Sequence, residues 1–168
     1  MNDSFILRDR IWREQNERVT LSSNATFASK SLGRYLDEEP DAFRTCFERD
    51  RDRIIHSKTF RRLKHKTQVF INPDGDHFIT RMTHTLNVTQ IGRSIAKTLG
   101  LNPDLTEAIC LGHDVGHSPF GHTGEDVLNE MLDGGWSHSE NSVRMLSVIE
   151  PLNLTKETIN GIEKHPWR

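Results

Sequence analysis

Residues 111–122, LGHDVGHSPFGH, place three histidines and an aspartate within one short segment. Imidazole and carboxylate groups together bind Zn, Mn, Fe or Mg, depending on the geometry of the site. A metal held in this way lowers the pKa of a bound water and yields hydroxide near neutral pH. The segment therefore predicts hydrolysis at a metal centre, with His113 and Asp114 as the first candidate ligands.

His113 and Asp114 are neighbours, so on a helix their side chains point roughly 100° apart. Both reach one metal only if it lies between the two directions and a second helix supplies another ligand. His84, upstream on a predicted long helix, is the natural partner. One alternative is a buried His113 capped by the adjacent carboxylate. Another is a metal shared by His113 and His117, which ranks lower because residues 116–119 are expected to end the helix.

The segments around this motif predict a mostly α-helical single domain. Apolar residues recur at helical spacing over residues 82–99, and Gly100 is a good stop signal. Asn102 followed by Pro103 is typical of a helix start. Further helices are expected at residues 4–17 with Ser4 as the cap, from Asp41 through residue 66, and at residues 103–113, 124–132, 139–149 and 155–162.

Two short β-prone runs, residues 69–71 and 77–79, flank the sequence NPDGD at residues 72–76. A Pro-Asp-Gly turn between such runs predicts one small β-hairpin in the otherwise helical fold. Residues 1–40 are expected to form an N-terminal helix and loop segment, and residues 41–168 the main domain.

The composition indicates a globular protein without a strong charge bias. A chain of 168 residues with 34% hydrophobic and 27% charged residues is long enough for one apolar core. Its net charge of −2 provides no global basic field for nucleic acid. The two cysteines, Cys46 and Cys110, fit a reducing cytosol, and neither a bilayer-spanning stretch nor a signal peptide is recognisable. We therefore expect a cytoplasmic protein with no membrane partner.

Other polar residues could extend the site. His122 and Glu125 lie three residues apart, where a carboxylate could orient the imidazole as an acid or base. From spacing alone, an ordinary pair at a helix start is the better interpretation. Arg81 precedes His84 by three residues, which places its guanidinium beside the metal ligand and toward a phosphate oxygen. A solvent-exposed arginine is the usual alternative.

A basic segment spans residues 58–66, and most such runs are solvated helix faces. In a slightly acidic chain it could instead form an anion pocket or bind single-stranded nucleic acid weakly. Trp136 and His138 follow a Gly-Gly break, where a loop could bring His138 toward the site. The basic segment contains Arg61, Arg62, Lys64 and Lys66, with Phe60 and Leu63 between them.

Taken together, these segments resemble the HD-domain superfamily of metal-dependent phosphohydrolases. Within it, the chain is similar to the bacterial deoxyguanosine triphosphate triphosphohydrolase family and its dGTPase-like relatives. The resemblance covers the chain from about Ser29 onward, and the blocks in this order are far more specific than a His-Asp pair. The blocks are RDRDRIIHS (49–57), FRRLKHKTQVF (60–70), TRMTHT (80–85) and HDVGHSPFGHTGE (113–125), with Gly33-Arg34 and Trp136–His138 in agreement.

The resemblance implies one divalent metal ion (Mn, Mg, Fe or Zn) bound by His84, His113 and Asp114. It implies that the enzyme cleaves a deoxynucleoside triphosphate, with dGTP favoured, to a deoxynucleoside and intact triphosphate. The remaining implied roles are proton transfer by His122 and Glu125, phosphate contacts by Arg81, His117 and His138, and a place near the deoxynucleoside for Gln68.

The family's fourth metal ligand is an aspartate on a later helix, beyond the region that this chain matches. We therefore expect either a piece of a longer enzyme or a short homologue, with the domain at residues 41–168 lacking its C-terminal part. A three-ligand site still holds metal when water fills the open positions. The relatives form oligomers, so a homo-oligomer is expected. The alternatives are another HD-type nucleotide phosphohydrolase and an inactive nucleotide- or nucleic-acid-binding module.

Overall fold

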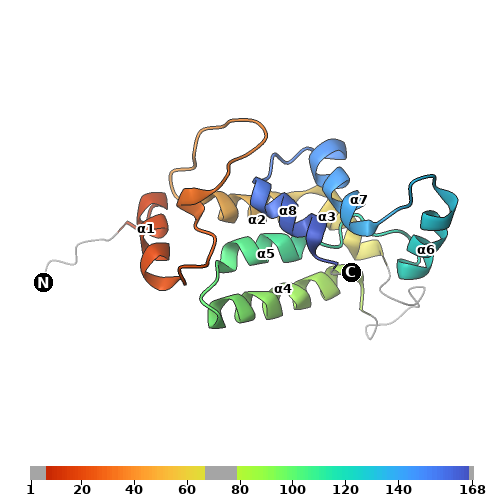
Figure 1. Ribbon diagram of the computed structural model, residues 1–168, viewed down its shortest axis with the longest axis horizontal. Coiled ribbons are helices and arrows are strands. Elements are labelled where there is room, and N and C mark those ends of the chain that lie inside the picture. The colour runs from red at the N-terminus through yellow and green to blue at the C-terminus, as the bar shows by residue number, and fades with distance from the viewer. Residues whose placement is uncertain (1–6, 67–78, 167–168) are drawn as a thin grey trace, which may run out of the picture.

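The computed structural model describes residues 7–66 and 79–166, and this part of the chain is mostly helical, as expected (Figure 1). Short 3-10 turns lie at Ala28–Lys30 and Leu63–His65, and a π-helical turn, Met145–Ile149, continues α7. The helices are α1 (Arg10–Thr20), α2 (Cys46–His56), α3 (Lys58–Arg62), α4 (Arg81–Thr98), α5 (Pro103–Gly112), α6 (Gly121–Met131), α7 (His138–Arg144) and α8 (Lys156–Lys164).

The predicted hairpin lies almost wholly within residues 67–78, outside the described residues, so it stays a prediction. An isolated antiparallel bridge joins Arg34 to Thr155. This bridge connects the N-terminal loop to the start of α8. No helix in the described ranges is both long and apolar enough to cross a membrane.

Helix α5 lies at the centre of the fold and ends at the His-Asp motif. It packs against α4, α2 and α8, and α4 runs alongside it (Figure 1). The predicted start is confirmed: the Asn102 side-chain oxygen accepts hydrogen bonds from the backbone N–H groups of Asp104 and Leu105 at 3.1 and 3.2 Å. Pro103 occupies the first turn, where a missing N–H costs nothing.

The apolar core lies between α5 and the helices around it. It combines residues from α2 and α3, which precede the His-Asp motif by some fifty positions, with a residue from α8, which follows that motif. Segments distant in sequence therefore pack together under the site. The buried members are Ile54, Phe60, Leu63, Ala108, Leu111, Val115, Leu146, Leu154 and Ile162.

The loop after α5 is held tightly against α7. A Cβ on Gly116 would clash with the backbone of Asn141 and Ser142, so only glycine permits this approach. The Gly116 N–H donates to the Ser142 hydroxyl at 2.9 Å, and that hydroxyl also lies within hydrogen-bond distance of the His113 and His138 carbonyls. The motif and the start of α7 are thus fixed to each other.

Two predicted helix starts near the N-terminus are wrong. Helix α1 begins at Arg10, where the Asp9 carboxylate accepts from the Trp12 N–H at 2.8 Å; Ser4, the predicted cap, lies outside the described residues. The helix expected from Asp41 begins only at Cys46, because Thr45 and the glutamate three residues on form a capping box.

Helix α6 also begins earlier than predicted. It starts at Gly121, so Glu125 lies in its second turn and the first turn contains no acidic residue. Phe120 and Gly121 have positive φ angles of 64° and 61°, which turn the chain sharply into α6. A left-handed conformation is unusual for phenylalanine, so its side chain gives no signal for this start.

The long helix α4 is confirmed, but the apolar residues that predicted it mostly face solvent. Arg81, Thr85, Thr89 and Ala96 are its buried residues, and α5 is the helix it packs against. The exposed apolar side chains are Leu86, Ile91, Ile95 and Leu99.

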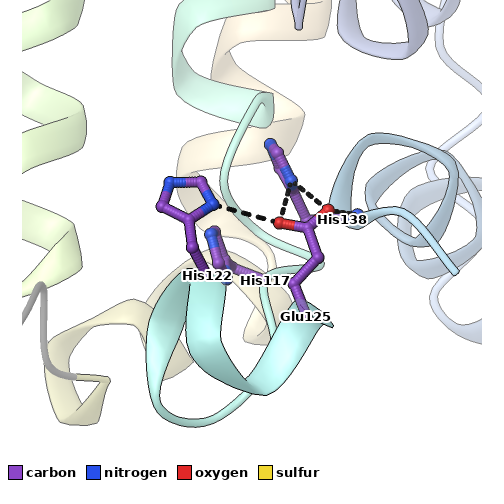
Figure 2. Close-up of side chains that lie close together, drawn as sticks. All are labelled: His117, His122, Glu125 and His138. Atoms are coloured by element: carbon purple, nitrogen blue, oxygen red, sulfur yellow. Dashed lines mark hydrogen bonds and ion pairs between the residues drawn. The ribbon is translucent and has the colours of Figure 1, made fainter. Parts of the chain in front are cut away.

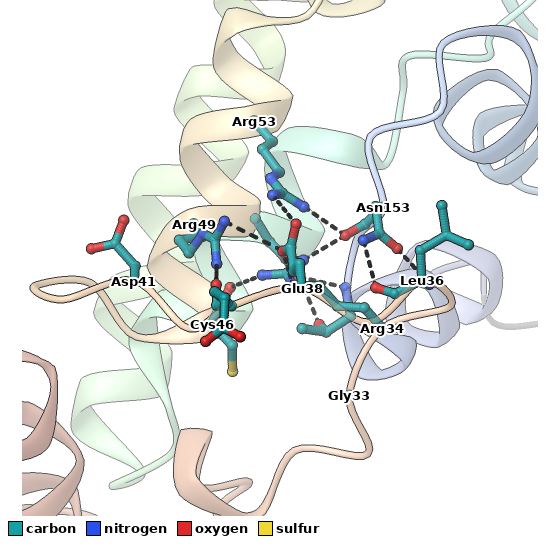
Figure 3. A network of polar contacts seen from close by, with 12 residues as sticks. Gly33, Arg34, Leu36, Glu38, Asp41, Cys46, Arg49, Arg53 and Asn153 are labelled. Atoms are coloured by element: carbon teal, nitrogen blue, oxygen red, sulfur yellow. Dashed lines mark hydrogen bonds and ion pairs between the residues drawn. The ribbon is translucent and has the colours of Figure 1, made fainter.

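A polar network joins the N-terminal loop to α2 and to the segment before α8 (Figure 3). Arg34 donates to the carbonyls of Asn153 and Cys46 at 2.6 and 3.0 Å and pairs with Glu38 at 2.7 Å. It also pairs with Asp50, which is fully buried in α2. Asp50 in turn accepts hydrogen bonds from the residues that begin α8, so three distant segments meet at one carboxylate.

Candidate metal centre

His84, His113 and Asp114 come together where the start of α4 meets the end of α5. One ligand atom from each lies within 4.8 Å of the others. The His84 and His113 ring centroids are 5.7 Å apart. The structure therefore brings His84 beside the His-Asp pair, in the arrangement that helix spacing predicted.

The orientation of His113 suits a metal ligand. Its Nδ1 lies 2.7 Å from the Cys110 carbonyl, which can only accept, so Nδ1 carries the proton. Its Nε2 is left as an electron pair, 3.7 Å from Asp114 Oδ1. Metal-binding histidines commonly donate their other ring N–H to a carbonyl in this way. Burial lowers the pKa of His84, which favours the neutral imidazole that metals bind.

Asp114 is buried and paired with Arg81. The Arg81 guanidinium lies 2.8 Å from Asp114 Oδ2, and both side chains are about 95% buried or more. Burial raises the pKa of Asp114, but the His113 and Arg81 charges outweigh it and hold the pKa below its usual value. Asp114 is therefore an ionised carboxylate. Arg81 lies beside the ligands, as the spacing predicted, but it contacts Asp114 rather than solvent.

These residues fit a divalent cation. Two imidazoles and an ionised carboxylate are donors that Zn, Mn or Fe accept in proteins. Asp114 Oδ1 and His113 Nε2 face the same space, whereas Oδ2 is held by Arg81. The carboxylate thus keeps one oxygen for a cation while the other is fixed.

A second cluster, formed by His117, His122, Glu125 and His138, lies beyond the His-Asp motif (Figure 2). Its residues come from the loop after α5, from α6 and from the start of α7. Their ligand atoms also lie within 4.8 Å of one another. His117 thus belongs to this cluster and not to the one with His113. The fold therefore does not group His113 with His117, the alternative metal pair.

Glu125 is the centre of the second cluster. Its carboxylate accepts from the His138 backbone N–H at 3.0 Å and from His138 Nδ1 at 2.9 Å. The same carboxylate lies 3.2 Å from His122 Nδ1. Burial raises the pKa of Glu125, but these hydrogen bonds outweigh it and lower the pKa to about 2. A single ionised carboxylate therefore orients two imidazoles.

His117 and His122 occupy contrasting environments. The His117 ring stacks on His138 with centroids 4.7 Å apart, and burial lowers its pKa to about 4. Both ring nitrogens of His117 are buried and form no hydrogen bond within the described residues. The His122 side chain is 75% exposed. His117 is thus a neutral inner imidazole, and His122 stands at the open side.

His165, at the end of α8, also reaches the site, and no local sequence pattern selects it. Its Nδ1 lies 2.7 Å from the Ile162 carbonyl, and its Nε2 lies 3.0 Å from His138 Nε2. Its ring is 5.2 Å from that of His113. His165 therefore stands between the two clusters. Its place depends on how α8 packs against α5 and α7, which no local pattern shows.

Two other residues from the sequence analysis remain, Gln68 and Lys66. Gln68 lies outside the described residues, so its predicted place near a deoxynucleoside stays a prediction. Lys66 donates to the carbonyls of Val115 and His117 at 3.1 and 2.9 Å, and burial lowers its pKa to about 8. Lys66 thus holds the loop of the motif. The exposed residues of the basic segment are Lys58, Arg61, Arg62, Lys64 and His65.

Comparison with known proteins identifies similar sequences over almost the whole chain. A family profile described as HD domain matches residues 81–166, which include both clusters. A deoxyguanosinetriphosphate triphosphohydrolase-like protein from Caldanaerobacter subterraneus subsp. tengcongensis is 59% identical over 156 residues, covering 90% of this chain and 46% of the relative.

Proteins with the same name occur in other bacteria. The Clostridium tetani protein is 54% identical over 167 residues, covering 97% of this chain and 47% of the relative. The Pelagibacter ubique protein is 56% identical over 146 residues, covering 82% and 39%. The chain spans about half the length of the curated relatives it matches, or less.

Proposed function

Because the chain belongs to the HD-domain family, we propose that it provides the metal-binding and proton-transfer groups of a phosphohydrolase. The proposed reaction converts a deoxynucleoside triphosphate, with dGTP favoured, to a deoxynucleoside and intact triphosphate. The observation that carries this proposal is a pair of clusters linked through the His165 ring: one fits a divalent cation, and the other holds imidazoles around an ionised carboxylate. The names of the relatives support the choice of substrate.

His84, His113 and Asp114 would hold the cation. A divalent ion bound there supplies Lewis acidity toward a phosphate oxygen and lowers the pKa of a coordinated water. Arg81 fixes the Asp114 carboxylate at 2.8 Å, so the ligand cannot rotate away. Arg81 also adds positive charge beside the position of an incoming phosphate.

His117 and His138 line the path between the cation and the leaving group. Their rings stack with centroids 4.7 Å apart, and both would contact the triphosphate. Glu125 fixes His138 through two hydrogen bonds, so the ring is positioned before the substrate binds. Gln68 is proposed to lie near the deoxynucleoside.

His122 and Glu125 would handle the leaving group. Glu125 accepts from His122 Nδ1 at 3.2 Å, which leaves Nε2 on the exposed side to face the substrate. When water attacks the α-phosphorus and the bond to the 5′-oxygen breaks, His122 Nε2–H donates its proton to that oxygen. The ionised Glu125 stabilises the imidazolium that precedes this transfer.

The test is to incubate the chain with dGTP and Mn²⁺ or Mg²⁺ and to identify the products by chromatography. We expect deoxyguanosine and triphosphate. His84→Ala should abolish turnover together with metal binding at the His84, His113 and Asp114 centre, and His122→Ala should lower the rate about 10²- to 10⁴-fold with metal binding at that centre intact. His56→Ala, at an exposed residue of α2, is the matched control. Release of pyrophosphate or orthophosphate would reject the reaction class.

A second candidate function is weak binding of single-stranded nucleic acid. The exposed Arg61, Arg62 and Lys64 on α3 and the following turn favour it, since clustered cations bind phosphates regardless of sequence. This binding would need no metal. An Arg61→Gln, Arg62→Gln, Lys64→Gln variant should lose salt-dependent affinity for an oligonucleotide, whereas chelation should leave that affinity unchanged.

The apolar face of α4 favours self-association. Ile91, Ile95 and Leu99 are exposed at intervals of four residues along one side of α4 and its C-terminal cap, and such patches commonly mark interfaces. We therefore include a homo-oligomer among the proposed partners. Sedimentation velocity over a concentration series tests it.

A further inference from the structure

His138 and His165 face each other in a way that ordinary hydrogen bonding does not explain. Their Nε2 atoms are 3.0 Å apart. His138 Nδ1 is engaged by the Glu125 carboxylate at 2.9 Å, and His165 Nδ1 by the Ile162 carbonyl at 2.7 Å. Carbonyl and ionised carboxylate oxygens only accept hydrogen bonds, so each Nδ1 carries a proton.

This assignment leaves both Nε2 atoms as electron pairs when the two rings are neutral. Two electron pairs only 3.0 Å apart repel, so a positive charge close to both is required. Either a proton or a metal ion can supply that charge. The two ring orientations match the arrangement of metal-binding histidines, in which the second ring nitrogen donates to a carboxylate or a backbone carbonyl.

We propose that His138 and His165 bind a second divalent transition-metal cation, distinct from the one assigned to His84, His113 and Asp114. Two imidazole nitrogens bonded at about 2.0–2.1 Å to one ion at a right angle lie about 3.0 Å apart, which is the separation observed. The ligand atoms are thus already at coordination distance from each other, as adjacent ligands of a six-coordinate ion.

The surroundings of this pair also favour a cation. His117 stacks on His138, is 3% exposed, and has two ring nitrogens without a hydrogen-bond partner in the described residues. The ionised Glu125 supplies negative charge next to His138, through the hydrogen bond to its Nδ1. The His113 ring lies 5.2 Å from that of His165, which places the second ion next to the first. Its remaining positions are open to water or a phosphate oxygen.

The test measures Mn²⁺ binding to the intact chain by isothermal titration calorimetry, with equilibrium dialysis and metal analysis as a second readout. We expect two equivalents bound per chain in the wild type. His165→Gln should bind one, His84→Gln should bind one, and the double variant should bind none. His56→Gln, at an exposed histidine outside both clusters, should bind two. Circular dichroism verifies that each variant is folded.

The stoichiometry of the wild type needs no variant, so a folding defect cannot obscure the result. A single equivalent in the wild type that His84→Gln abolishes would overturn the second site. The charge between His138 Nε2 and His165 Nε2 would then be a proton, and the proposed hydrolase would stand. Two equivalents in His165→Gln would overturn the assignment of His165. Absence of any binding would reject both this site and the metal centre of the proposed function.

Discussion

At the scale of single residues, the buried pair of Arg81 and Asp114 is the most sensitive feature of the site. Arg81→Gln would leave the Asp114 carboxylate buried without a full opposite charge. We expect the free energy of unfolding to fall by about 3 kcal/mol in the presence of a chelator, because an unpaired buried charge is costly. Urea denaturation followed by circular dichroism measures the loss.

Mn²⁺ should restore part of that stability, since a cation beside Asp114 replaces the lost charge and binds only the folded chain. The control is Arg144→Gln on α7, whose side chain is exposed and which should change stability by no more than about 0.5 kcal/mol. Equal losses in the two variants would show that the buried pair has no special role.

The neutral state of His117 makes stability depend on pH. Its pKa is about 4 in the folded chain, because of burial, and 6.5 is the ordinary value expected after unfolding. Between these pH values the unfolded chain binds a proton that the folded chain does not, so stability falls as the pH falls. The free energy of unfolding therefore keeps its full value above about pH 6.5 and falls progressively down to about pH 4. The neutral His117 accounts for at most about 3 kcal/mol of this fall.

Urea unfolding at several pH values between about 7 and 4.5, with a chelator present, measures this slope. His117→Gln should flatten it, although His84 and His165, whose pKa values burial also lowers, will keep part of it. His65→Gln, at an exposed histidine, should retain the wild-type slope. If the His117 variant kept the wild-type slope, the pH dependence of stability would not come from a neutral, buried His117.

Whether the position of a site residue could be predicted depends on whether a local sequence signal or the packing of two helices determines it. His84, His113 and Asp114 were identified because helix spacing and motif order are local signals, and the structure brings them together. The contact between Arg81 and Asp114 was not identified, since it requires the relative rotation of α4 and α5. The position of His165 was missed for the same reason.

At the scale of elements, α5 depends on its cap. The Asn102 side chain accepts from two N–H groups of the first turn and donates to Glu17 and the Thr26 carbonyl, both at 3.0 Å. Asn102→Ala removes all four hydrogen bonds at a residue that is 3% exposed. We expect a loss of about 2 kcal/mol, measured by thermal and urea unfolding.

The control is Asn87→Ala on the exposed side of α4, which should change stability by less than about 0.5 kcal/mol. If Asn102→Ala were as mild as this control, the cap would not stabilise the helix that carries the His-Asp pair.

Helix starts were predictable where the cap is a local signal. Asn102-Pro103 and Thr155 were read correctly, and both caps form hydrogen bonds in the structure. The start of α6 was not, because Phe120 adopts a positive φ that its residue type does not favour. The π-helical end of α7 at Met145–Ile149 likewise has no simple sequence pattern.

At the scale of the whole molecule, Asp50 ties the two ends of the fold together. It is fully buried, pairs with Arg34, and accepts from the Thr155 N–H and from the Thr155 and Thr158 hydroxyls at 2.9, 2.6 and 2.8 Å. Asp50→Asn removes the charge that all these donors share. We expect a loss of about 3 kcal/mol in the free energy of unfolding and faster proteolysis of the N-terminal loop.

Asp126→Asn, at an exposed aspartate of α6, is the matched control and should leave both measurements unchanged. Unaltered proteolysis in Asp50→Asn would mean that the loop is held by other contacts. The helical class of the molecule followed from periodicity alone. The hydrogen bonds between Asp50 and residues more than a hundred positions away could not be predicted, because only the packing of the folded chain brings these residues together.

This long-range tie has a consequence for biosynthesis. The hydroxyls that complete the Asp50 site lie 105 and 108 positions downstream of it, so a nascent chain carries Asp50 without these donors until α8 leaves the ribosome. The imidazole at position 165 arrives in the same step. Translation thus delivers the histidine motif before His165, and pauses near the codons for α8 should govern how much of the nascent protein reaches its native state.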